Sequence, residues 1–198
     1  AFENTFAYDL SAFYYNYTNF QSQVYQNGQY IAVNSGRAHS PGFEASLQQA
    51  FGDNISAFLN YSYLHARFDD TDQNGNPQQY AGDHLRLAPD NSASLGVLWN
   101  VPLSDSRAFY FRPSYTWRSK VYFEDDNNPS YVQAGYGLLN LRTGVTFDQG
   151  RWDAGLWGSN LANKKYLIDG GNTGENFGLP TYIPGSPRTF GISLSGRF

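Results

Sequence analysis

Residues 109–118 read FYFRPSYTWR, and the alternation in this stretch decides the fold. Every second side chain is apolar, from Phe109 to Trp117, whereas Tyr110, Arg112 and the other residues between them carry polar groups. Successive side chains of a β-strand point to opposite faces. The stretch therefore predicts a strand with one apolar face and one polar face.

The same period of two recurs along the chain and predicts an all-β fold. No window approaches the 18 or more consecutive apolar residues of a membrane-spanning helix. Tyr, Phe, Val, Thr and Ser, which suit a pleated surface, fill the alternating positions. About eight strands are expected, at residues 6–14, 30–50, 55–63, 93–99, 109–118, 139–147, 151–159 and 190–198.

Composition narrows the class of protein. Only 15% of the 198 residues are charged, against about 25% in ordinary soluble domains, while 18% are aromatic. The absence of Cys excludes disulfides, thiol catalysis and Cys-ligated metals. The net charge of −4, without a basic block, argues against nucleic acid as a partner. No Ser/His/Asp or paired-carboxylate arrangement has catalytic spacing, so the sequence predicts neither an enzyme nor a cofactor.

The connections alternate between short and long. Tight turns are expected near residues 52, 104 and 149, and long polar loops near 80, 128 and 172. In outer-membrane barrels the short turns face the periplasm and the long loops face outside. The apolar face also ends in aromatic residues, as a girdle at a lipid–water boundary does. These residues are Tyr61, Tyr63, Trp99, Tyr115, Trp117 and Trp152.

Two other interpretations explain part of this pattern of alternating residues and loops. A soluble β-sandwich also alternates, and exposed Tyr and Trp would suit a carbohydrate-binding sandwich. A stand-alone eight-stranded outer-membrane barrel with a structural or adhesive role is the other alternative. Strands of ten or more residues ending in a terminal Phe favour a transmembrane antiparallel β-barrel over the sandwich.

Several motifs occur in a recognisable order. Residues 159–166 read SNLANKKY, and residues 184–191 read PGSPRTFG before the last strand. Upstream, residues 34–44 read NSGRAHSPGFE, and Tyr61-Ser62-Tyr63 and Ala88-Pro89 follow. This ordered set resembles the end of TonB-dependent outer-membrane receptors. The resemblance covers nearly the whole chain.

The resemblance implies a fold and a function. Barrels of this family have 22 strands around a plug, which need roughly 450 to 550 residues. Residues 1–198 are therefore expected to be a C-terminal segment of about eight strands, without the plug and the earlier strands. The implied function is active transport across the bacterial outer membrane, with a ferric siderophore or a similarly scarce nutrient as ligand. The implied partners are the remainder of the receptor, TonB through the plug, the barrel-assembly machinery and outer-membrane lipid.

Two groups of residues are candidates for these roles. Tyr and Arg near the loop bases combine a flat surface with a polar tip, which suits catecholate, aromatic or sugar ligands. The candidate ligand contacts are Tyr80, Arg86, Tyr122, Tyr131, Tyr166 and Tyr182. The last strand ends in an aromatic residue, which the resemblance identifies as an assembly signal. Its apolar face carries Phe190, Ile192, Leu194 and Phe198.

Weaker motifs suggest metal or cation binding. Asp70, Asp72 and Asn74 match the first half of a calcium loop, but Ala81 stands where a bidentate Glu is needed. We therefore expect a solvated loop and no metal. An acidic run at 124–126 would attract a cationic or metal-loaded ligand. His39 and His65 are expected to lie almost opposite each other, as rim histidines without a third metal ligand.

Overall fold

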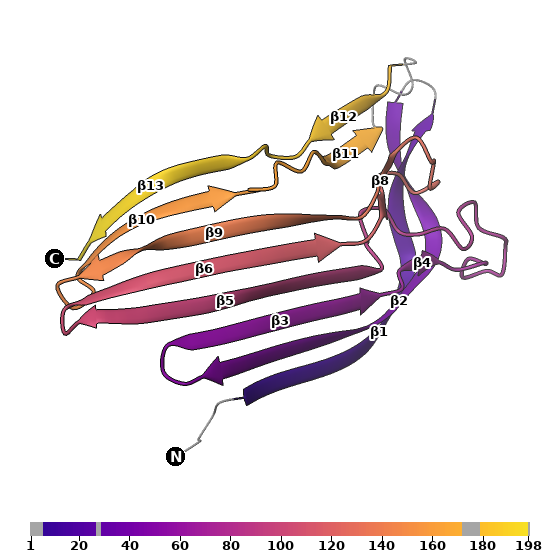
Figure 1. Cartoon of the computed structure of the whole chain (residues 1–198). Coiled ribbons are helices and arrows are strands. Elements are labelled where there is room, and N and C mark those ends of the chain that lie inside the picture. Colours follow the sequence, from indigo (N-terminus) through magenta and orange to yellow (C-terminus); the bar gives the residue numbers. More distant parts are fainter. Residues whose placement is uncertain (1–5, 27–28, 172–178, 198) are drawn as a thin grey trace.

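A computed structural model describes residues 6–26, 29–171 and 179–197. Its main element is one antiparallel sheet of eight long strands in the order β1-β2-β3-β5-β6-β9-β10-β13 (Figure 1). The strands are β1 (Phe6–Gln26), β2 (Gln29–Phe51), β3 (Ile55–Leu64), β5 (Asn91–Ser104), β6 (Arg107–Arg118), β9 (Tyr136–Phe147), β10 (Trp152–Ser159) and β13 (Thr189–Gly196). The prediction of about eight strands in an all-β fold is confirmed.

The remaining strands are short and lie in the long connections. They are β4 (Arg67–Phe68), β7 (Val121–Tyr122), β8 (Val132–Gln133), β11 (Leu167–Gly171) and β12 (Thr181–Pro184). β4 pairs with β2, β7 with β8, and β11 with β12. The sequence predicted only a glycine-rich segment at 160–185, so the β11–β12 pair is an addition. Among the described residues, no helix is long and apolar enough to cross a membrane.

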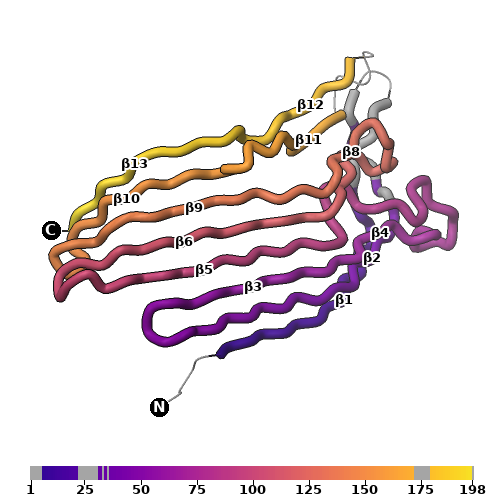
Figure 2. The backbone as a smooth tube through the Cα atoms, in the orientation of Figure 1, coloured from indigo at the N-terminus to yellow at the C-terminus, as the bar shows by residue number. Residues whose placement is uncertain are grey.

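The two ends of the sheet differ, as the alternation of turns and loops predicted. The turns that join β2 to β3, β5 to β6 and β9 to β10 all lie at the left end of the view in Figure 1. The three long connections, which start after β3, β6 and β10, lie at the other end, and the tube in Figure 2 shows them gathered there. Positive φ angles at Gly52 (68°) and Gly150 (84°) fit two of the tight turns.

The two faces of the sheet differ in the same regular way. On one face the large side chains are exposed rather than packed in a core, and we call it the apolar face. It includes Leu10, Phe43, Leu47, Leu59, Leu95, Trp99, Leu139, Leu156, Phe190, Ile192 and Leu194. The opposite face, here called the polar face, carries Ser, Asn, Glu, Arg and Asp. A single sheet with an exposed apolar face is not a sandwich, which would bury that face against a second sheet.

The sheet is open in the part of the chain that the structure describes. β1 pairs only with β2, and β13 only with β10. The barrel is therefore not closed by these eight strands. Phe190, Ile192 and Leu194 lie on the apolar face of β13 with 71–82% of their surface exposed. Phe198, the fourth residue of the expected assembly signal, lies outside the described residues.

Candidate functional site

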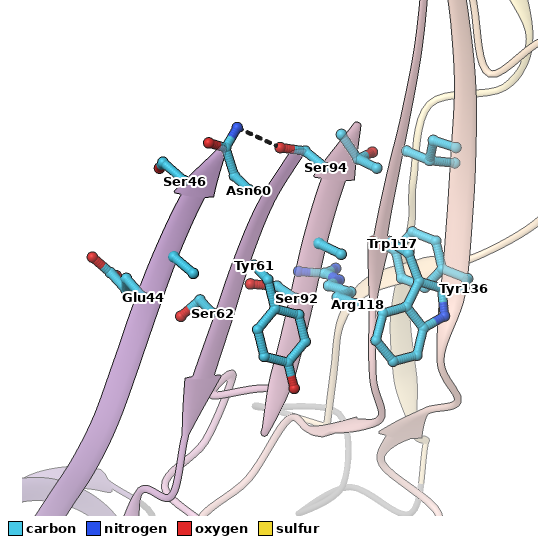
Figure 3. A pocket seen from close by; sticks show the side chains of 14 residues that line it. Glu44, Ser46, Asn60, Tyr61, Ser62, Ser92, Ser94, Trp117, Arg118 and Tyr136 are labelled. Carbon is cyan, nitrogen blue, oxygen red and sulfur yellow. Dashed lines mark hydrogen bonds between the residues drawn. The ribbon is translucent and has the colours of Figure 1, made fainter. Parts of the chain in front are cut away.

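A hollow of about 520 Å³ lies on the polar face, across five neighbouring strands from β2 to β9 (Figure 3). Strand register explains its lining, since Glu44, Ser62, Ser92, Arg118 and Tyr136 are successive cross-strand partners in one row. The next row toward the turns contributes five more lining residues. They are Ser46, Asn60, Ser94, Thr116 and Leu138.

Side-chain size produces the hollow. The centre of both rows consists of short side chains, and Asn60 Nδ2 donates a hydrogen bond of 3.1 Å to Ser94 Oγ there. Longer charged side chains flank the serines, with Glu44 on β2 and Arg118 on β6. The hollow therefore offers hydroxyl groups between a carboxylate and a guanidinium, which suits a ligand rich in hydroxyl or carboxylate groups.

Arg118 has an uncommon environment. Its guanidinium lies 4.8 Å from the centroid of the Tyr136 ring, a cation–π contact. Its Nε is buried and has no hydrogen-bond partner among the residues that the structure describes. A buried N–H without an acceptor costs free energy, so an acceptor supplied from outside would be favourable at this position. The sequence placed Arg118 on the polar face but did not single it out.

The candidate ligand residues lie mainly in a packed assembly of loops. Tyr131 is buried to 4% exposure against Val121 and Phe123, and its ring centroid lies 6.0 Å from that of Tyr182. Tyr182 donates a hydrogen bond of 3.2 Å to the carbonyl oxygen of Ser130. These two candidates are thus brought together, and both also pack the loops.

Arg86 and Tyr122 join the same assembly. Arg86 forms an ion pair of 3.9 Å with Asp169 of β11, the strand that pairs with β12. The Tyr122 hydroxyl accepts a hydrogen bond of 2.7 Å from Lys120 Nζ. The backbone N–H of Leu87 donates to the carbonyl oxygen of Tyr122 at 2.8 Å, which joins the two connections.

Tyr80 and Tyr166 have other ring partners. The Tyr80 ring packs on Phe68 at 5.6 Å, and burial together with the carboxylates of Asp125 and Asp126 raises the pKa of its phenol. Tyr166 stacks on Tyr136 with ring centroids 4.5 Å apart. Tyr136 lines the hollow, so Tyr166 contacts one of the lining residues. Contact of any of the six with a ligand stays a prediction.

The histidines form part of a polar network near the loop bases. The rings of His39 and His65 lie 6.1 Å apart, although the register partner of His39 is Arg67. His39 Nδ1 lies 2.5 Å from Asp69 Oδ1. In the ranges described, no group of three or more His, Asp or Glu side chains is placed to hold a metal ion.

The residues that match the first half of a calcium loop, Asp70, Asp72 and Asn74, lie in a tight hairpin and not in an open loop. Asp72 Oδ1 accepts hydrogen bonds from the backbone N–H groups of Asn74 and Asn76, at 2.8 and 2.9 Å. Asp72 Oδ2 accepts from the Asn76 side chain at 3.1 Å. These bonds lower the pKa of Asp72 and occupy both of its oxygens. Glu124, Asp125 and Asp126 lie in the next long connection, where burial raises the pKa of Asp125.

His84 connects two of the long loops. Its backbone N–H donates to Asn127 Oδ1, and Asn127 Nδ2 donates to the His84 carbonyl oxygen, both at 2.9 Å. Its Nδ1 lies 3.7 Å from Asp90 Oδ1, which also pairs with Arg67 at 3.0 Å. Burial, with a smaller contribution from Arg67, lowers the pKa of His84 below its usual value despite the opposing effect of Asp90.

This pKa gives a testable pH dependence. Because the folded protein lowers the pKa, protonation favours the state in which the loops have separated. The loop contact should therefore be complete above about pH 6.5 and weaken as the pH falls through the lowered pKa. We expect hydrogen-exchange protection, corrected for intrinsic rates, to fall at residues 83–90 and 124–128 between pH 7.5 and 5.5. In His84→Gln this loss of protection should be smaller, while Asp83 and Asp125, whose pKa values burial raises, still titrate. An unchanged pH profile in that variant would contradict the role of His84.

Comparisons with known proteins agree with this geometry. The family described as TonB dependent receptor-like β-barrel matches residues 2–161. No curated protein matches the chain. Among solved structures, the ferric yersiniabactin uptake receptor FyuA from Yersinia pestis is 20% identical, with a TM-score of 0.80 over 96% of this chain. The ferric citrate transporter FecA is 17% identical, with a TM-score of 0.77 over 99%.

A third structure extends the comparison. The siderophore receptor PiuA from Acinetobacter baumannii is 16% identical, with a TM-score of 0.71 over 98% of this chain. At sequence identities of 16–20%, the similarity to these three structures shows the fold alone. The chain spans 27% of FyuA, 29% of FecA and 26% of PiuA.

Proposed function

We propose that this chain, which belongs to the TonB-dependent receptor-like β-barrel family, forms part of the wall of an outer-membrane receptor for nutrient uptake. The observation that carries the proposal is the division of one sheet into an exposed apolar face and a polar face. Long loops gather at one end of this sheet. Such a sheet is stable where lipid covers the apolar face and water or protein covers the other.

The bacterial outer membrane supplies this environment. β3, β6 and β9 have 10 to 12 residues, which matches the length that crosses a bilayer when tilted. In this orientation the turns near 52, 104 and 149 face the periplasm. The connections that start after β3, β6 and β10 then face outside, where they meet the ligand first.

We propose a ferric siderophore as the leading ligand class. FyuA and PiuA, which share the fold, are described as a ferric yersiniabactin receptor and a siderophore receptor. The hydroxyls, carboxylate and guanidinium around the hollow suit an oxygen-rich chelate. Cobalamin, haem and oligosaccharides remain alternative cargoes.

The proposal includes partners outside this chain. Residues 1–198 would be the C-terminal segment of a longer receptor whose plug occupies the lumen and contacts TonB. The exposed apolar row of β13 would be read by the barrel-assembly machinery. Barrels of this type act in transport, and no catalytic role is proposed.

Uptake in cells tests the function. In a strain that lacks other iron receptors, the complete receptor should support accumulation of radiolabelled iron from at least one ferric siderophore, and deletion of TonB should abolish it. A panel of catecholate, hydroxamate and citrate chelates, with cobalamin and haem, covers the ligand classes. Failure of every ferric chelate would contradict the siderophore proposal.

Two substitutions test the site within that assay. Arg118→Gln removes the guanidinium beside the hollow, and Tyr166→Ala removes the ring that supports Tyr136. Each should weaken ligand binding by at least about tenfold, or 1.4 kcal/mol, at unchanged surface levels. Arg107→Gln, at the opposite end of β6, is the matched control and should bind normally. Equal binding by all three variants would contradict a ligand site at the hollow.

A further inference from the structure

A second polar cluster lies on the polar face, nearer to the tight turns than the hollow. Arg112 of β6 and Arg142 of β9 are direct cross-strand partners. Both guanidiniums lie over the same ring, at 4.7 and 6.0 Å from the centroid of Tyr110. Like charges placed directly opposite each other destabilise a strand pair. The arrangement therefore calls for compensating negative charge.

Asp153 supplies part of that charge. Its Oδ1 lies 3.2 Å from Arg142 Nη2 and accepts a hydrogen bond of 3.2 Å from the Tyr110 hydroxyl. Arg112 has no carboxylate partner among the described residues, and its hydrogen bond goes to Asn100 Oδ1 at 3.3 Å. The cluster thus has one surplus positive charge. The Arg142 side chain is 51% exposed to solvent.

The cluster is held in place by the sheet beneath it. Tyr110 is buried to 3% exposure, and its hydroxyl reaches across β9 to Asp153 on β10. Gly144 and Gly155 make room for this, since a Cβ at either position would lie within 2.5 Å of the Tyr110 hydroxyl oxygen. The two guanidiniums therefore lie over a ring that is itself fixed in the sheet, where both can reach one anion.

We propose that Arg112 and Arg142 bind a carboxylate of the polypeptide that lies against the polar face in the complete receptor. Charge complementarity identifies the group, because two arginines facing one acceptor bind a carboxylate through charge-assisted hydrogen bonds. The polypeptide that carries this carboxylate is inferred from chain length. This chain spans only 26–29% of the solved receptors, so the rest of such a receptor lies outside it. The inference rests on the proposed function in one respect, that polypeptide fills the lumen.

Photo-crosslinking in the complete receptor tests the contact. Benzoylphenylalanine at position 112 should crosslink to a peptide from outside residues 6–197 that contains Asp or Glu. The same group at position 107, at the end of the same strand, is the control and should not reach that peptide. No crosslink from position 112, or a crosslink only to peptides without acidic residues, would overturn the inference.

Charge exchange then tests the chemistry. Arg112→Glu should speed release of the lumenal polypeptide in urea at least about tenfold, whereas Arg112→Gln should have a smaller effect. Replacing the crosslinked acidic residue by Lys should restore slow release in Arg112→Glu. Equal effects of Arg112→Glu and Arg112→Gln would overturn the inference. Loss of the slow release when millimolar citrate or acetate is added to the unmodified receptor would also overturn it, in favour of a free anion as the ligand of the two arginines. Iron uptake is measured separately, so a receptor without uptake that still shows the crosslink and the charge rescue would contradict only the proposed function.

Discussion

Replacing Gly144 with alanine is expected to cause a large loss of the folded form of the proposed outer-membrane receptor. A Cβ at this position would lie 2.4 Å from the backbone carbonyl oxygen of Ala154. That carbonyl belongs to β10, the hydrogen-bonded neighbour of β9. Only separation of the two strands relieves the contact, and each ladder bond lost inside a bilayer costs about several kcal/mol. We expect at least about a tenfold loss of the heat-modifiable folded form on cold gels.

Gly155→Ala is the matched comparison. The nearest obstacle to a Cβ there is the Tyr110 hydroxyl oxygen at 2.3 Å, and the next atoms lie at 3.2 Å. Tyr110→Phe removes that oxygen, so it should restore folding in Gly155→Ala. It should not rescue Gly144→Ala, where the backbone contact remains. Rescue of both variants, or of neither, would show that Tyr110 does not lie across the two glycines as described.

Asn160→Ala is expected to cause the second large effect, a loss of folding stability. The substitution removes the contact between two segments that are far apart in the sequence. The Asn160 side chain is buried to 2% exposure. Its Nδ2 donates to the carbonyl oxygens of Lys164 and Ser186, at 2.9 and 3.1 Å, and its Oδ1 accepts from the Lys164 N–H at 2.8 Å. Alanine would leave these groups without partners, which costs about 3 kcal/mol in total. Urea unfolding of the purified receptor measures this loss.

Asn163→Ala controls for backbone strain. Asn160 and Asn163 both have positive φ angles, 49° and 52°, a conformation that Asn tolerates better than Ala. Asn163 is exposed, and its side chain accepts one long contact of 3.4 Å from the Arg188 N–H. Its replacement should cost only about 1 kcal/mol, from strain. Equal losses in the two variants would mean that the buried hydrogen bonds contribute nothing.

These bonds also explain why two of the motifs occur together. The sequence showed SNLANKKY at 159–166 and PGSPRTFG at 184–191 as separate elements. In the structure Asn160 joins the first to Ser186 of the second. Gly185 lies against the Tyr166 ring, since a Cβ there would be 2.1 Å from a ring carbon. The resemblance therefore rested on residues that touch.

The long strands were predictable because their signal is local. Alternation of single residues, as in 109–118, determines strand and face without knowledge of neighbours. The β11–β12 pair was not predictable in this way. Its strands have five and four residues and include Gly170, Gly171 and Pro184, which weaken a strand pattern.

The hollow on the polar face was missed for a different reason. Ser62, Ser92 and Arg118 form one row only after three strands are aligned, and one of the two connections involved exceeds 20 residues. Register across such a loop cannot be read from one sequence. The packing of Tyr131 and Tyr182 was hidden for the same reason, because their rings come from separate connections.

The unequal connections have a consequence for the order in which the sheet forms. β2 with β3, β5 with β6, and β9 with β10 are joined by turns of only two to four residues. Their contacts are close in sequence, so their closure costs little chain entropy and occurs early. Pairing between these hairpins must close the long loops first. The wall is therefore expected to assemble from ready-made hairpins, with docking of one hairpin on the next as the slow step.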